Sequence, residues 1–214
     1  MELKGKRVAF LGDSITAGVG AGEIKNRFTD VFERMTESVS LNYGVSGTRI
    51  ARQKKADDPY YEDFNRRVSR MDENADVVVV FGGTNDYGHG DAPLGKLGDD
   101  TVYTFYGAVS VLCQSLLDKY PRATIVFMTP LHRLNENTAI NEFGFAHEPL
   151  SAYVKAIKVV AEYYALPVLD LYSTSGFQPA VKSIRDIYTP DGLHPSAAGA
   201  ERIAIRLKNF LQTL

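Results

Sequence analysis

Five short runs of apolar residues recur along this chain of 214 residues and constrain its fold more than any other feature. The runs are almost continuous rather than alternating with polar residues, which is typical of strands buried on both faces of a parallel sheet. The clearest run is Val77-Val78-Val79-Val80, because four consecutive β-branched side chains pack poorly in a helix. The predicted strands are Val8–Leu11, Val39–Tyr43, Val77–Phe81, Thr124–Met128 and Val168–Leu171.

Segments with apolar residues at helical spacing lie between these strands. Strand and helix alternate along the whole chain, with no internal repeat and no linker. This alternation predicts one α/β domain over residues 1–214, with helices on both faces of the sheet. The predicted helical stripes are Phe28, Val31, Phe32 and Met35; Tyr61, Phe64 and Val68; Val102, Phe105, Val109, Leu112 and Leu116; Leu150, Tyr153, Val154, Ile157 and Ala161; and Ala200, Ile203, Ala204, Leu207 and Leu211.

Composition and charge narrow the class of protein. The net charge of −2 provides no field that favours nucleic acid or an anionic membrane, so neither is expected as a partner. The single cysteine, Cys113, cannot form a disulfide within the chain, and its apolar surroundings predict a buried thiol. The first residues lack the apolar core of a signal peptide, and no apolar run approaches the ~20 residues of a membrane span. A cytoplasmic location is therefore expected.

Two short motifs at opposite ends of the chain contain groups that are able to do chemistry together. Ser14 follows the first predicted strand within Gly12-Asp13-Ser14-Ile15-Thr16, which places it at the carboxyl edge of the sheet. His194 lies just before the last predicted helix, three residues after Asp191. A carboxylate bonded to one ring nitrogen fixes the tautomer of the histidine, so that the other nitrogen is free to accept a serine proton. These residues supply the parts of a hydrolytic triad, although each motif alone also fits an ordinary turn.

Two further loops offer donors for a developing oxyanion. Gly47 follows the second predicted strand and can bring a bare backbone N–H close to a substrate. Asn85 follows the third predicted strand within Gly82-Gly83-Thr84-Asn85-Asp86, and its side-chain amide is a second candidate donor. Three successive strands thus end in polar motifs that contain glycine, and a carboxylate–histidine pair comes near the end of the chain.

These four blocks, in this order, resemble the SGNH hydrolases, which are also called GDSL-type esterases and lipases. The resemblance spans nearly the whole chain and implies a flavodoxin-like three-layer α/β/α sandwich with a five-stranded parallel sheet. It implies that Ser14 is the nucleophile, His194 the base and Asp191 its orienting acid, with an oxyanion hole formed by Ser14, Gly47 and Asn85. It also implies no metal and no cofactor. The motif departs from the family pattern at Ile15, where the family has leucine.

Long segments follow the later strands and are expected to shape the substrate site, because loops of this length in a compact domain are usually functional. They mix aromatic and polar residues and contain no long apolar lid. We therefore expect a small-molecule ester with a small, acetyl-like acyl group on a sugar or other polar alcohol. The candidate substrate contacts are Asp13, for which the resemblance also implies a structural role, and Thr84, Tyr87, His132, Phe143 and Tyr188.

Several alternatives stay open at this point. A thioesterase or a lysophospholipase-type enzyme would use the same triad, and transfer to an acceptor other than water would need no other residues. Asp13, Asp86, Asp191 and His194 are also possible ligands of a metal-dependent phosphoesterase. A non-catalytic carbohydrate-binding module is a further possibility. The Gly18–Gly22 segment lacks the spacing of a dinucleotide-binding loop. The sequence indicates no oligomeric state.

Overall fold

A computed structural model describes residues 1–54 and 60–214 and contains the predicted five-stranded parallel sheet. The strand order is β2-β1-β3-β4-β5, as the flavodoxin-like expectation requires. The predicted bounds of β3 and β4 are confirmed, and those of β1 and β2 agree within one residue. The strands are β1 (Arg7–Gly12), β2 (Val39–Gly44), β3 (Val77–Phe81), β4 (Thr124–Met128) and β5 (Val168–Leu169).

Two strand predictions need correction. β5 is shorter than predicted, because Asp170 accepts a hydrogen bond from the Ser173 N–H and caps a helical turn that begins at Leu171. β2 is an edge strand whose residues are partly or fully exposed, so the expectation of burial on both faces is wrong there. The central strands β1 and β3 are buried almost throughout, as predicted.

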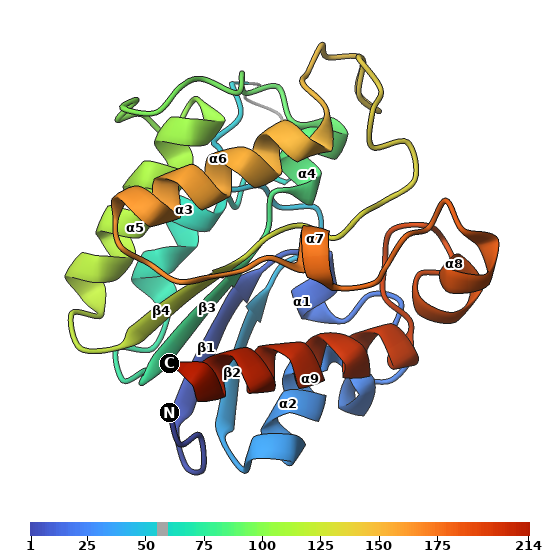
Figure 1. Cartoon of the computed structure of the whole chain (residues 1–214). Coiled ribbons are helices and arrows are strands. Elements are labelled where there is room, and N and C mark those ends of the chain that lie inside the picture. Colours follow the sequence, from blue (N-terminus) through green and yellow to red (C-terminus); the bar gives the residue numbers. More distant parts are fainter. Residues whose placement is uncertain (55–59) are drawn as a thin grey trace.

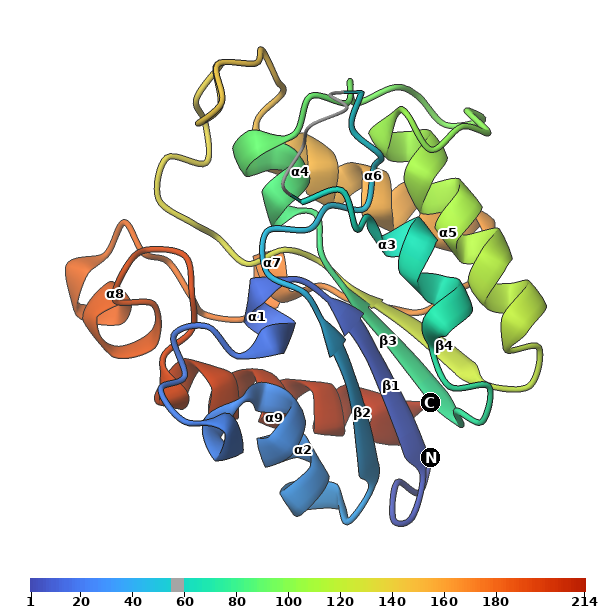
Figure 2. The ribbon, with the colours of Figure 1, turned by 180° about the vertical axis from the view of Figure 1, so that it is seen from behind.

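Helices cover both faces of the sheet and give the predicted three layers, which Figures 1 and 2 show from opposite sides. On one face, α1, α2, α7 and α9 pack with Phe10 and Val79 of the central strands. On the other face, α3, α4, α5 and α6 pack with Leu11 and Val80. Alternate residues of each strand therefore serve two separate apolar cores.

The helices that directly follow strands at the carboxyl edge are short, whereas the helices that pack along the faces of the sheet are longer. Cys113, on one of the long helices, is buried as predicted, and burial raises the pKa of its thiol to about 12. The described elements are α1 (Ser14–Ala17), α2 (Phe28–Thr36), α3 (Phe64–Arg67), α4 (Thr84–His89), α5 (Phe105–Lys119), α6 (Leu150–Tyr163), α7 (Leu171–Thr174), α8 (Lys182–Tyr188) and α9 (Ala197–Thr213), with 3₁₀ turns η1 (Ile24–Asn26) and η2 (Val68–Arg70).

The parallel register brings the ends of three strands to one edge of the sheet. Gly12 at the end of β1 is paired with Gly44 of β2 on one side and with Phe81 of β3 on the other. The loops that follow these strands begin with Asp13, Val45 and Gly82 and therefore start side by side. In an open parallel sheet this edge is where ligands bind, so the fold brings three of the four motif blocks together.

Candidate active site

Ser14 is the first residue of the short helix α1, directly after β1. Asp13 caps this helix by accepting a hydrogen bond from the Ile15 N–H at 3.0 Å. Gly44 allows the helix to sit against the end of β2, since a Cβ there would lie 2.3 Å from the Ala17 nitrogen. As the first helical residue, Ser14 has a backbone N–H with no partner within its own helix. Its local structure therefore leaves both the hydroxyl and the N–H of Ser14 available at the edge of the sheet.

Ser14 and His194 are 180 residues apart in sequence and hydrogen-bonded in the structure. The Ser14 Oγ lies 2.9 Å from His194 Nε2, and His194 Nδ1 lies 2.7 Å from Asp191 Oδ2. Because the Nδ1–H donates to the carboxylate, Nε2 is the acceptor for the serine hydroxyl. The other Asp191 oxygen accepts from the backbone N–H groups of Leu193 and His194, at 2.9 and 2.7 Å.

The electrostatics of Asp191 favour its ionised form. Burial alone would raise the pKa of this carboxyl, but the hydrogen bonds from the His194 ring, the Leu193 N–H and the His194 N–H lower it below its ordinary value. An ionised carboxylate at this place stabilises a positive charge on His194. The arrangement is thus suited to moving a proton from Ser14 to the imidazole.

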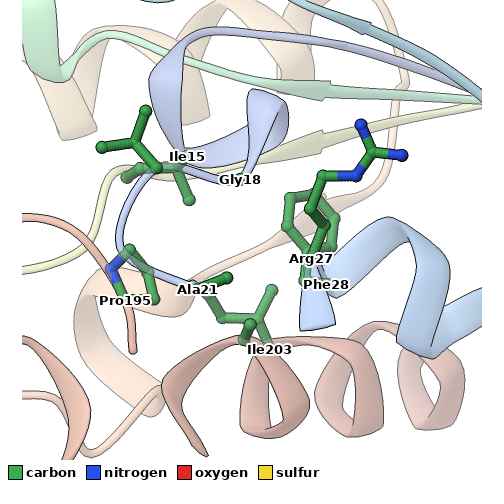
Figure 3. Close-up of a pocket in the computed structure, with 9 residues that line it drawn as sticks. Ile15, Gly18, Ala21, Arg27, Phe28, Pro195 and Ile203 are labelled. Atoms are coloured by element: carbon green, nitrogen blue, oxygen red, sulfur yellow. The ribbon is translucent and has the colours of Figure 1, made fainter. Parts of the chain in front are cut away.

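The Gly18–Gly22 segment supports the histidine. A Cβ on Gly20 would lie 2.7 Å from the Pro195 carbonyl oxygen and 2.9 Å from the His194 Cβ, so only glycine fits this approach. A small apolar pocket lies behind the two segments and is lined by Ile15 and Gly18 on one side and Pro195 and Ile203 on the other (Figure 3). The serine and histidine segments therefore rest on a shared apolar support.

Gly47 and Asn85 belong to loops that are hydrogen-bonded to each other. Asn85, on α4, donates from Nδ2 to the Thr48 carbonyl oxygen at 3.0 Å. Gly47, the residue before Thr48, has a φ of +75°, a conformation that glycine adopts without strain. Among the described residues, the Gly47 N–H has no hydrogen-bond acceptor. The structure brings these two candidate donors to neighbouring positions at the edge that also holds Ser14.

A buried arginine, Arg67, connects the ends of β1 and β2 with the loop that contains Gly47. Arg67 donates from Nη2 to the Gly12 carbonyl oxygen at 3.0 Å and to Thr48 Oγ1 at 2.9 Å, and from Nη1 to the Tyr43 carbonyl oxygen. Burial lowers the pKa of this guanidinium to about 10, against the attraction of Asp13. Arg67 thereby fastens the end of β1, the end of β2 and the loop of Gly47 to one side chain.

Two buried carboxyl groups, those of Asp86 and Asp13, also hold the backbone near the site. Asp86 accepts from the backbone N–H groups of Ile50 and Ala51, at 3.0 and 2.8 Å. Burial raises the pKa of Asp86 to about 6, although these hydrogen bonds and Arg49 act in the opposite direction. Burial also raises the pKa of Asp13 to about 7, against the hydrogen bond from Ile15 and the charge of Arg67. Buried ionisable groups thus hold the loops that follow β1, β2 and β3.

Asp13, Thr84 and Tyr87 were predicted as substrate contacts, and all three are buried. The Tyr87 hydroxyl donates to the Asn135 carbonyl oxygen and lies 3.0 Å from Thr138 Oγ1, so it fastens the loop of residues 129–147 to α4. Within the part of the chain that the structure describes, the Thr84 hydroxyl has no hydrogen-bond partner. Substrate contact by these residues stays a prediction.

The other predicted contacts lie on three different segments. His132 packs on Tyr172 with ring centroids 3.8 Å apart, and its Nδ1 lies 2.9 Å from the Glu136 carboxylate. Phe143 is 51% exposed. Tyr188, at the end of α8, stacks on Phe177 at 5.2 Å. None of these contacts tests a role in substrate binding, so all three residues stay candidates.

Arg67, Thr48 and Arg49 were not identified from the sequence as site residues. Arg67 occurs beside Arg66 in a charged stretch that reads as a solvated helix face, so nothing in the local pattern distinguishes the buried arginine from the exposed one. The one available signal was the apolar context of Phe64 and Val68, which share the short helical segment with Arg67. A charged side chain is buried by residues that are distant in sequence, so its burial cannot be predicted from the local residue pattern.

Residues 1–54 and 60–214 were searched for a metal site and for a membrane-spanning helix. No group of three or more His, Cys, Asp or Glu side chains there is arranged to hold a metal ion. No helix in these ranges is long and apolar enough to cross a membrane.

A parallel α/β sandwich with these motif blocks at its carboxyl edge is the architecture of the SGNH-type ester hydrolases. The chain belongs to the GDSL-like lipase/acylhydrolase family, whose model matches residues 10–202. The resemblance stated from the sequence is therefore confirmed, and the chain is an enzyme that hydrolyses ester bonds.

Solved structures share this fold. One has 36% sequence identity and a TM-score of 0.87, with 100% of this chain and 99% of the other covered. A Lactobacillus plantarum protein has 34% identity and a TM-score of 0.84 over 99% and 98% of the two chains. A lipase/acylhydrolase from Enterococcus faecalis has 21% identity and a TM-score of 0.69 over 97% and 96%, which indicates a common fold. A search of the curated proteins found no match to the chain.

Proposed function

We propose that this chain is a serine esterase that removes small, acetyl-like acyl groups from a sugar or another polar alcohol. The observation that carries the proposal is the hydrogen-bonded series of Ser14, His194 and Asp191, with 2.9 Å between Ser14 Oγ and His194 Nε2 and 2.7 Å between His194 Nδ1 and Asp191 Oδ2. A serine hydroxyl is a weak nucleophile until a base accepts its proton, and this geometry provides that base.

The reaction proceeds through an acyl-enzyme. Ser14 attacks the ester carbonyl while His194 takes the hydroxyl proton, and Asp191 stabilises the imidazolium. The oxyanion of the tetrahedral intermediate accepts hydrogen bonds from the Ser14 and Gly47 N–H groups and the Asn85 amide. His194 then protonates the leaving alcohol, and water repeats the sequence on the acyl-Ser14 ester. One Asn85 N–H is already directed to the Thr48 carbonyl oxygen, which fixes the orientation of the other.

The loop of residues 129–147 supports a small, polar substrate. Polar contacts fasten this loop to α4: Asn141 Nδ2 donates to the carbonyl oxygen of Gly90, which follows the helix, at 2.8 Å, and Arg133 Nη1 donates to the Thr84 carbonyl oxygen at 3.2 Å. A long acyl chain would need a continuous apolar surface to replace the water that it leaves. A loop held by amides and charges favours a short acyl group.

The decisive experiment compares the wild-type enzyme with Ser14→Ala and Asn85→Ala. Ser14→Ala should lower ester turnover by several powers of ten with an unchanged fold, because it removes the nucleophile. Asn85→Ala should lower kcat by about 10²–10³, the usual effect of losing one oxyanion donor. Full turnover by Ser14→Ala, with the fold checked by circular dichroism, would refute the proposal.

A chain-length series of p-nitrophenyl esters tests the acyl preference separately. Acetate and propionate esters should give the highest kcat/KM. Best activity on octanoate or longer esters would instead support the lysophospholipase-type alternative, and a preference for acetyl thioesters over matched oxygen esters would support a thioesterase.

A further inference from the structure

Three aromatic rings from separate segments form a continuous row. The rings of Tyr60 and His89 have centroids 5.1 Å apart and an interplanar angle of 40°. The rings of His89 and Phe143 have centroids 5.2 Å apart and an angle of 37°. We refer to Tyr60, His89 and Phe143 as the aromatic strip. Its members come from the segment before α3, the last residue of α4 and the loop of residues 129–147.

The aromatic strip begins at the proposed oxyanion hole. The Tyr60 ring lies directly against Gly47, since a Cβ on that glycine would be 2.4 Å from two ring atoms. His89 follows Asn85 by four residues on α4 and therefore lies one turn away on the same face of the helix. Both the glycine and the asparagine proposed to bind the oxyanion are thus neighbours of the strip.

The middle ring presents one defined hydrogen-bond donor. Arg49 Nη1 lies 3.1 Å from both His89 Nδ1 and the His89 carbonyl oxygen. Burial, together with the charge of Arg49, lowers the pKa of His89 to about 4, so the ring is neutral at neutral pH. Because Nδ1 accepts from the guanidinium, the ring proton is on Nε2. The strip therefore combines aromatic rings, of which Phe143 is exposed, with a single fixed N–H donor.

The outer end of the strip is open to solvent. Phe143 is 51% exposed, although a phenylalanine in the interior would bury more apolar area. Its backbone N–H is held by Asn141 Oδ1 at 3.1 Å, and Gly144 and Phe145 complete the same tight turn. The turn fixes an aromatic side chain at the surface, an arrangement that suits contact with a ligand.

We propose that the aromatic strip binds the sugar ring of the ester's alcohol part. This assignment rests on the proposed function, in which the acyl group is too small to reach three rings. The C–H bonds on one face of a pyranose carry a small positive charge and are attracted to the negative faces of aromatic rings. A sugar hydroxyl supplies the acceptor that the single N–H donor requires. A flexible polyol lacks a flat face and gains less from the strip.

Acetate release from two matched substrates tests the proposal: a monoacetylated methyl glucopyranoside and glycerol monoacetate. The variant is Phe143→Ala, which removes an exposed ring without opening the core. The matched control is Tyr163→Ala, which removes a 71%-exposed ring at the end of α6. Phe143→Ala should lower the ratio of kcat/KM for the glucoside over the glycerol ester by about twofold to twelvefold, mainly through KM, because an aromatic contact contributes about 0.5–1.5 kcal/mol. Tyr163→Ala should leave this ratio unchanged.

Three outcomes would overturn the assignment of the strip. They are an unchanged ratio in Phe143→Ala, an equal loss with both substrates, or a loss confined to an added aromatic-acyl ester such as glycerol monobenzoate. Inhibition by unesterified methyl glucopyranoside adds a binding readout, and its Ki should rise by the same factor as the KM. Ser14→Ala keeps the two proposals separate: an inactive Ser14→Ala with an unchanged Phe143→Ala ratio refutes the strip alone, whereas an active Ser14→Ala refutes the proposed function.

Discussion

Replacing Asp13 by asparagine should stabilise the protein at mildly alkaline pH and change little at acidic pH. Burial raises the pKa of the Asp13 carboxyl from its ordinary value of 3.8 to about 7. Asparagine has the same shape as a protonated aspartic acid, and its Oδ1 is able to keep the hydrogen bond from the Ile15 N–H. The substitution therefore mimics the neutral state of Asp13 at every pH.

The sign and size of the effect follow from proton linkage. Between the two pKa values, the folded protein binds a proton at Asp13 that the unfolded chain has lost, so the free energy of unfolding falls as the pH rises. For a folded pKa of about 7, the loss between about pH 5 and about pH 7.5 is about 2–3 kcal/mol, since one pKa unit corresponds to about 1.4 kcal/mol. The Asp13→Asn variant lacks this group, so its stability relative to the wild type should rise by that amount between the two pH values.

Urea unfolding at the two pH values provides the measurement. The informative quantity is the double difference between variant and wild type, because the other titrating groups contribute to both proteins and cancel. Asp100→Asn, at an exposed carboxyl, is the matched control and should follow the wild type. A double difference near zero would refute the raised pKa of Asp13. A variant less stable than the wild type at pH 7.5 would show that attraction between Asp13 and Arg67 outweighs burial.

Two other substitutions test how the site is held. Arg67→Met should lower kcat by about 10²-fold in initial-rate assays, with a smaller change in KM, because small displacements of catalytic donors are costly. The control Arg66→Met removes an exposed neighbour, and equal effects would contradict a positioning role. Gly20→Ala should lower both Tm and kcat, because its Cβ would lie 2.9 Å from the His194 Cβ. Gly22→Ala has similar backbone strain with nothing within 4 Å, so its kcat should be preserved.

The sheet was predictable because its signal is local. Continuous β-branched runs such as Val77–Phe81 specify buried strands without reference to the rest of the chain. The two errors have different origins. β2 lies at the sheet edge, and its apolar residues Val39, Leu41 and Tyr43 alternate with polar ones, a pattern typical of a partly exposed strand. β5 ends early because the Asp170 side chain caps the helix that begins at the next residue, and such capping does not appear in hydrophobic periodicity.

The candidate site was predictable to the extent that its groups occur in short motifs. Ser14 and the Asp191–His194 pair were found because spacing of one to three residues fixes their local geometry, and parallel topology brings them to one edge. Arg67 gives no such signal, since its partners are the backbone carbonyls of Gly12 and Tyr43. A carbonyl group has no sequence identity, so a side chain that binds the backbone leaves no motif.

The buried side chains of Asp86 and Arg67 bind backbone groups of the loops that form the site. A loop that leaves a strand at the sheet edge carries backbone N–H and C=O groups into the interior, and each needs a partner. Asp86 accepts from two successive N–H groups, those of Ile50 and Ala51. Arg67 donates to two carbonyl oxygens on adjacent strands, those of Gly12 and Tyr43.

Apolar residues of similar volume would often be neutral or stabilising in place of buried charges, but they would leave these backbone groups unsatisfied. Asp86 and Arg67 thus supply the hydrogen-bond partners that the loop backbone needs, as neighbouring strands supply them within the sheet. These two side chains fix the backbone that carries the Gly47 N–H and the residues that adjoin Ser14 and Asn85. On this reasoning, rigid oxyanion donors and a pKa of about 7 at Asp13 have one physical origin, the burial of polar groups under the catalytic edge.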